Sequence, residues 1–129
     1  MNRFLLAVIV SCVSIVSDAG EKSLSYADAK AVWNKNADSP AYQTYAAEFS
    51  QFNNHFQLDV KDGCYSKSSG PVEMMLVITH PDKSSPYAII EDVISDVTNA
   101  KAECFKRTYK GISTKVPPFL PFVLQMTMN

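Results

Sequence analysis

The sequence predicts an α+β domain in which two N-terminal helices precede a ββαβ unit with a three-stranded antiparallel sheet. Two segments before residue 57 carry apolar residues at helical spacing behind capping serines. Three later segments are either continuously apolar or alternate between apolar and polar residues, as strands do. A capped amphipathic segment separates the second of these strands from the third. The order of these patterns defines the fold class.

The two N-terminal helices are expected within residues 24–57. Ser25 can cap the first, and Asp28 completes an approximate capping box. Ser39 can cap the second, and Pro40 takes its first helical position, where a missing N–H is tolerated. The second helix carries an aromatic stripe that we expect in the core rather than on a ligand platform. The stripe consists of Tyr42, Tyr45, Ala46, Phe49, Phe52 and Phe56.

Three strands are expected in the C-terminal half. Val72–Thr79 is almost continuously apolar, which suits a central strand covered on both faces. Tyr87–Ser95 is rich in β-branched residues and follows the turn HPDKSSP. Phe122–Met128 alternates with period two and has three prolines before it, which is typical of an edge strand. We expect the last strand beside the first, which leaves the other two strands as edges.

The segment between the second and third strands predicts a crossover helix. Asp96 or Thr98 can cap its start, and Gly111 suits its left-handed stop. Lysine and arginine side chains in its last turn complement the helix dipole. The stripe expected to face the sheet consists of Val97, Ala100, Cys104 and Phe105.

Residues 1–19 have the pattern of a secretory signal peptide cleaved after Ala19. Arg3 precedes an apolar run from Phe4 to Val16 that is too short for a membrane span of about 20 residues. An uncleaved anchor and lipidation at Cys12 remain as alternatives. Cleavage leaves residues 20–129 as one small domain in the periplasm or outside the cell.

The mature chain would keep two cysteines, Cys64 and Cys104. An even pair in an exported domain predicts a disulfide, and two unpaired structural cysteines are the alternative. The formal net charge of −1 offers no basic surplus for phosphate backbones, so nucleic acid is not an expected partner.

Few residues suggest catalysis or metal binding. The two histidines, His55 and His80, form no H-x-x-x-H motif, and no C-x-x-C or glycine-rich phosphate loop occurs. We therefore expect no enzyme activity, no metal and no cofactor. A weaker reading is an enzyme that uses His80 with Asp82 or Glu73. The acidic residues Glu91, Asp92 and Asp96 are interpreted as a solvated face or a helix cap.

The C-terminal half resembles a known family. The stretch GCYSKSSGPVEMMLVIT, the helix with ECFKR and the end PPFLPFVLQMTM look like the C-terminal domain of TonB and TolA type periplasmic proteins. Relatives of the gliding-motility AgmX/PglI type are more similar, since their CY pair and helix cysteine match Cys64, Tyr65 and Cys104. The resemblance covers about residues 60–129. It implies a ββαβ domain that binds proteins through a strand edge.

Transferred to this chain, the resemblance implies a small periplasmic protein whose last strand pairs with a protein or an extended peptide. The matching edge is formed by Phe122, Val123, Leu124, Gln125, Met126 and Thr127. Energy transduction is not expected, because residues 21–60 have helical patterns rather than a proline-rich spacer. An exposed edge also permits a homodimer by strand pairing. The alternative is a secreted hydrolase inhibitor or effector that uses the loops Lys61–Gly70 or His80–Ser85.

Overall fold

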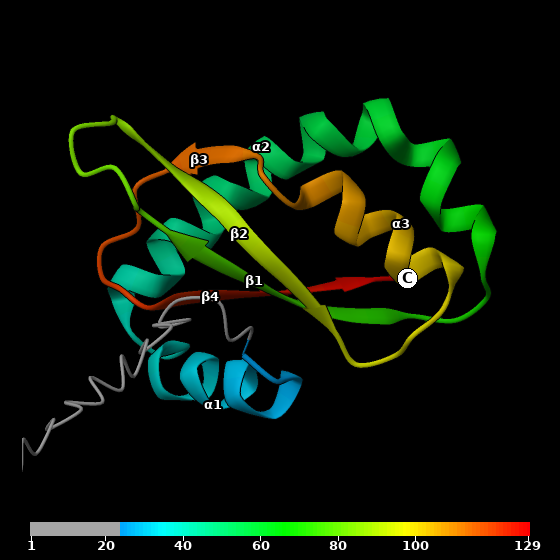
Figure 1. Cartoon of the computed structure of the whole chain (residues 1–129), viewed down its shortest axis with the longest axis horizontal. Coiled ribbons are helices and arrows are strands. Elements are labelled where there is room, and N and C mark those ends of the chain that lie inside the picture. Colours follow the sequence, from blue (N-terminus) through cyan, green and yellow to red (C-terminus); the bar gives the residue numbers. More distant parts are fainter. Residues whose placement is uncertain (1–23) are drawn as a thin grey trace, which may run out of the picture.

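The mixed α+β architecture is confirmed, with one more strand than predicted (Figure 1). A computed structural model describes residues 24–129, apart from the side chains of residues 54–62. The signal peptide expected at residues 1–19, with Cys12 in it, lies outside the described residues. The elements are α1 (Tyr26–Asn36), α2 (Pro40–Cys64), a 3₁₀ turn (Tyr65–Lys67), β1 (Val72–Thr79), β2 (Tyr87–Ser95), α3 (Ala100–Tyr109), β3 (Ser113–Lys115) and β4 (Phe122–Met128).

The sheet has the strand order β3-β2-β1-β4, and every neighbouring pair is antiparallel. The last strand lies beside the first, as predicted, with a register that runs from Val72 opposite Met128 to Ile78 opposite Phe122. The crossover through α3 brings the chain back to that position, and the heavily apolar β1 is a central strand.

The prediction that β2 is an edge strand was wrong over its first half. β3 pairs with Tyr87–Ile89, so the sheet has four strands. Gly111, at a positive φ of 85°, turns the chain after α3, and its N–H donates to the Ile90 carbonyl at 2.8 Å. The Ile90 N–H donates in turn to the Ile112 carbonyl at 2.9 Å. The predicted stop at Gly111 is thus confirmed, and it also starts the extra strand.

The second helix is longer than predicted. α2 continues to Cys64, so part of the expected loop Lys61–Gly70 is helical. The predicted disulfide is present, and it joins Cys64 to Cys104 of α3 with a Cα–Cα distance of 5.3 Å. Cys64 is buried in the core. This tertiary anchor outweighs the turn preference of the preceding Asp-Gly pair. His55 lies within α2, and its side chain is outside the described residues.

The caps predicted for α1 and α2 are confirmed, whereas the one predicted for α3 was wrong. Ser25 accepts a hydrogen bond from the Asp28 N–H, and Ser39 accepts one from the Tyr42 N–H. In α3 the cap is Asn99, whose side chain accepts from Ala102 at 2.8 Å. Val97 precedes this cap and is 38% exposed, and Ala100 is exposed as well, so neither belongs to the buried stripe of the helix, which does include Phe105.

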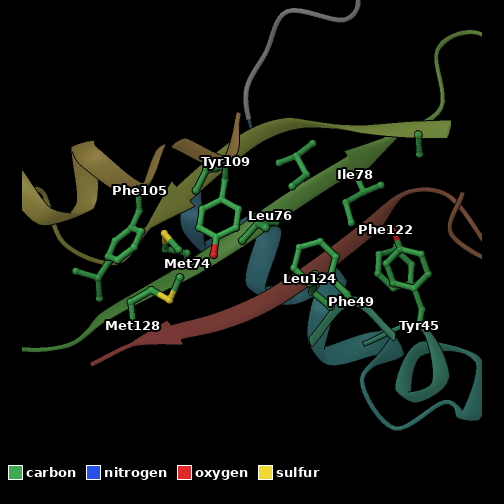
Figure 2. Packing of buried hydrophobic residues seen from close by; sticks show 14 of the residues in the cluster. Tyr45, Phe49, Met74, Leu76, Ile78, Phe105, Tyr109, Phe122, Leu124 and Met128 are labelled. Carbon is green, nitrogen blue, oxygen red and sulfur yellow. The ribbon is translucent and has the colours of Figure 1, made fainter. Parts of the chain in front are cut away.

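The main core lies between the sheet and the pair of helices α2 and α3 (Figure 2). At one end the Phe122 ring contacts Tyr42 and Tyr45, with ring centroids 5.4 and 4.6 Å apart. Tyr42, Tyr45 and Phe49 of the aromatic stripe are therefore core, as predicted, and Ala46 is partly buried against them, whereas the side chain of Phe56 lies outside the described residues. Phe52 differs, because it lies at the margin of the sheet and is 41% exposed.

A second, smaller core forms between α1 and the opposite face of the sheet. Its fully buried members are Ala29, Met75 and Val123. Because α1 and α2 cover opposite faces and are joined by the short connection 37–39, the chain passes around the outer edge of β4 (Figure 1). This course of the chain determines the environment of the predicted binding strand.

Candidate functional site

The outer edge of β4 is the predicted binding edge, and its outward backbone groups come from alternate residues. The Gln125 N–H points away from β1, toward the Tyr42 hydroxyl at 3.4 Å. Because backbone direction alternates along an antiparallel strand, Val123 and Thr127 point outward as well. These two outward amides have no hydrogen-bond partner among the residues that the structure describes. Leu124 and Met126, opposite Leu76 and Met74, point their backbone groups toward β1.

The middle of this edge is covered by two aromatic side chains. The Trp33 indole N–H of α1 donates to the Tyr42 hydroxyl at 2.8 Å, and the same hydroxyl faces Gln125. Burial raises the pKa of Tyr42, so this phenol stays neutral at physiological pH. Sequence reasoning placed Tyr42 in the core and missed this contact. A usable signal was the pairing of tryptophan and tyrosine across a short helix connection, since both rings carry a polar group that needs a partner.

The six predicted edge residues differ in what their side chains contact. Phe122 and Leu124 are buried in the main core, and Met126 packs against it. Val123 is buried beneath α1, whereas Thr127 is exposed to solvent. A partner strand would therefore contact the backbone of this edge and the Thr127 side chain rather than a row of exposed side chains.

A polar cluster attaches α1 to the sheet next to this edge. Glu73 of β1 accepts a hydrogen bond from the Gln125 side chain at 2.7 Å and lies 3.5 Å from the Lys30 ammonium. The Tyr26 hydroxyl is buried beside it without a hydrogen bond of ordinary geometry. The nearby Tyr26 hydroxyl makes the largest contribution to lowering the pKa of the Glu73 carboxyl, and the Gln125 side chain and the Lys30 ammonium lower it further. Glu73 is therefore ionised at neutral pH and holds α1 through charge and hydrogen bonds.

The other edge of the sheet borders a groove of about 300 Å³ between α2 and β3. Phe52 and Tyr87, which is 60% exposed, line it together with Phe49. Its backbone edge is partly occupied, because the Tyr45 hydroxyl donates to the Lys115 carbonyl at 2.6 Å. The Lys115 ammonium also lies 2.5 Å from the Glu48 carboxylate across the groove. This apolar hollow was not predicted, because the strand beside it was not.

The loop His80–Ser85 is held by its own hydrogen bonds. The His80 Nε2 atom lies 2.8 Å from the Ser85 carbonyl oxygen. Asp82 accepts hydrogen bonds from the hydroxyl and the N–H of Ser84, which lower the pKa of its carboxyl. Glu73 lies near the other end of β1, so the catalytic reading that combined it with His80 does not correspond to one site.

Part of the second predicted loop, residues 65–70, is fixed to α3. The buried Lys101 ammonium donates to the Gly70 carbonyl at 2.7 Å and lies 5.5 Å from the centre of the Tyr65 ring. The Ser68 hydroxyl accepts from the Lys101 N–H at 3.2 Å. These contacts anchor the segment between the disulfide and β1.

Among the side chains that the structure describes, those of residues 24–53 and 63–129, no three His, Cys, Asp or Glu side chains gather closely enough to hold a metal ion. No helix in the described part of the chain combines the length and hydrophobicity that a membrane span requires. Comparison with family models, curated proteins and solved structures finds no match to this chain.

Proposed function

We propose that this protein is an extracytoplasmic binding module that captures an extended segment of a partner protein by strand addition at the outer edge of β4. The observation that carries the proposal is the long hydrogen bond of the Gln125 backbone N–H. This N–H points outward and lies 3.4 Å from the Tyr42 hydroxyl. A backbone carbonyl at about 2.9 Å would satisfy this amide better.

The backbone groups at this edge set the strength of the interaction. Val123, Gln125 and Thr127 each direct an N–H and a carbonyl outward. At a net of about 1 kcal/mol for each hydrogen bond, the full set contributes roughly 6 kcal/mol. A dissociation constant of about 1 μM corresponds to about 8 kcal/mol. We therefore expect backbone pairing alone to give affinities weaker than micromolar, and side-chain contacts to supply the rest.

Two further features support the proposal. The disulfide between Cys64 and Cys104 is typical of proteins in oxidising compartments, in agreement with the signal peptide expected at residues 1–19. The resemblance of residues 60–129 to TonB/TolA-type domains implies binding along a strand edge. Three prolines before β4 limit pairing at its entrance, which directs a partner to Phe122–Thr127.

A proline substitution tests the proposal directly. Extended decapeptides are selected against the oxidised protein from a displayed library, and their affinity is measured by calorimetry. Thr127→Pro removes an outward N–H while leaving the bonds of β4 to β1 in place. We expect it to weaken binding about tenfold or more, whereas Thr127→Val, which keeps the amide, should bind like the parent. Equal binding by both variants would contradict the proposal.

The loop His80–Ser85 favours a second candidate function, inhibition of a secreted hydrolase. Its internal hydrogen bonds hold an exposed segment in one conformation, which lowers the entropy lost when it enters an enzyme cleft. Lys83 lies in this loop and is exposed. Inhibition assays over a panel of secreted hydrolases would test this function. Loss of inhibition in Lys83→Ala would support it, and inhibition unaffected by the substitution would reject it.

A further inference from the structure

We infer that α1 and the first turn of α2 form a gate over the β4 edge, so that a partner strand pairs with β4 only after α1 leaves the sheet. The inference concerns the regulation of the edge proposed above, and it therefore rests on that function. The gate is defined as residues 26–42. Its central contact is the chain of hydrogen-bonding groups from Trp33 through Tyr42 to Gln125.

The gate lies where an added strand would have to lie. α1 covers the face of the sheet that contains Val123, α2 covers the face that contains Phe122, and their connection passes around β4. The Tyr42 hydroxyl occupies the position from which a partner carbonyl would accept the Gln125 N–H. Strand addition through the middle of β4 therefore requires this corner to move.

Of the three helices, α1 has the fewest buried residues, although it contacts β4, β1 and β2. Only Ala29 of its residues is buried, and its charged contact, Lys30 with Glu73, is partly exposed at 3.5 Å. An isolated helix of 11 residues is shorter than the roughly 12–15 residues needed for marginal stability in water. By contrast, α2 and α3 are joined by the disulfide and share the main core. Segments with few buried contacts open first in native proteins, which makes α1 the element that opens.

Opening of the gate defines the chemistry of the partner. When α1 leaves, Met75 and Val123 lose their cover, and the Tyr42 hydroxyl loses the Trp33 indole N–H that holds it beside the outward amide of Gln125. A strand added beside β4 would place every second side chain on the face that α1 had covered. We therefore expect an extended partner segment with apolar residues at alternate positions on that face, which would restore the buried apolar contact.

Hydrogen exchange measured by NMR tests the gate without any partner. In the oxidised full chain, the amides of Ala29 and Trp33 should exchange through one opening event together with Gln125. The Met126 amide, which points toward β1, should exchange much more slowly, and the exposed Thr127 amide faster. Trp33→Phe removes the indole hydrogen bond to Tyr42, and we expect about fivefold faster exchange at Gln125 and in α1. Tyr87→Phe, at the opposite edge of the sheet, is the matched control and should change neither rate.

The outcomes separate the gate from the binding function. The gate is contradicted if Gln125 in the wild type exchanges only with the amides of β1, or if α1 opens without exposing Gln125. Equal acceleration of all amides in Trp33→Phe would also overturn it, since that result reports global destabilisation. If the variant does not fold, the exchange rates of the Ala29, Trp33, Gln125 and Met126 amides in the wild type decide the question on their own. A gate that opens in a protein that binds no strand would reject the proposed function and leave the gate intact.

Discussion

Removal of the disulfide tests the tertiary anchor of the fold. The bond closes a loop with a sequence separation of 40, and the chain-entropy relation assigns such a loop about 4 kcal/mol. We therefore expect the double substitution of Cys64 and Cys104 by alanine to lower the free energy of unfolding by about 4 kcal/mol. A domain of this size has a net stability of roughly 5–15 kcal/mol, so the loss is a large share.

Urea unfolding followed by circular dichroism measures this loss. With a slope of about 2 kcal/mol per molar urea, the midpoint should fall by about 2 M. Intact mass of the parent protein first establishes that two hydrogens are missing at the thiols. A midpoint shift below about 0.5 M with an unchanged slope would refute the reasoning. It would mean that the contact between α2 and α3 holds the loop together without the covalent bond.

Two further substitutions test the packing and the electrostatics. Phe122→Ala should lower the free energy of unfolding in urea by about 3–5 kcal/mol, because this fully buried ring is packed against Tyr42 and Tyr45. A loss below about 1 kcal/mol would show that the ring is not a central core contact. Glu73 faces Tyr26 and Lys30 of α1, and Asp96 accepts a hydrogen bond from its backbone N–H. The pKa of the Glu73 carboxyl is lower in the folded state than its ordinary value near 4.5, so the ionised carboxylate stabilises the fold above that pH. This stabilisation is lost as the pH falls below that value. The difference in unfolding free energy between the parent and Glu73→Gln should therefore shrink between pH 6 and pH 3, and a constant or growing difference would contradict the assigned role.

The sequence was sufficient to place β4, because two local signals agree. Period-two alternation in Phe122–Met128 identifies a strand, and the apolar continuity of Val72–Thr79 identifies the neighbour that needs cover on both sides. The disulfide was also predictable, since Cys64 and Cys104 are the two cysteines outside the expected signal peptide, and an even pair favours a bridge. Each of these inferences depends on residues close in sequence or on simple counting.

The missed features depend on contacts between distant segments. β3 has only three residues, too few to give a periodic signal, and it exists because Gly111 turns the chain back along β2. The length of α2 is set by its covalent link to α3 rather than by helix propensity. The cover over Gln125 arises because α1 and α2 lie on opposite faces of the sheet, a placement that no single segment encodes.

Isotope-edited nuclear Overhauser spectroscopy of a selected decapeptide bound to the labelled protein measures where a partner strand lies. Strand addition at β4 predicts cross-strand contacts between peptide backbone protons and those of Val123, Gln125 and Thr127. Contacts restricted to Phe52 and Tyr87, in the groove between α2 and β3, would contradict the account and place binding at the opposite edge of the sheet.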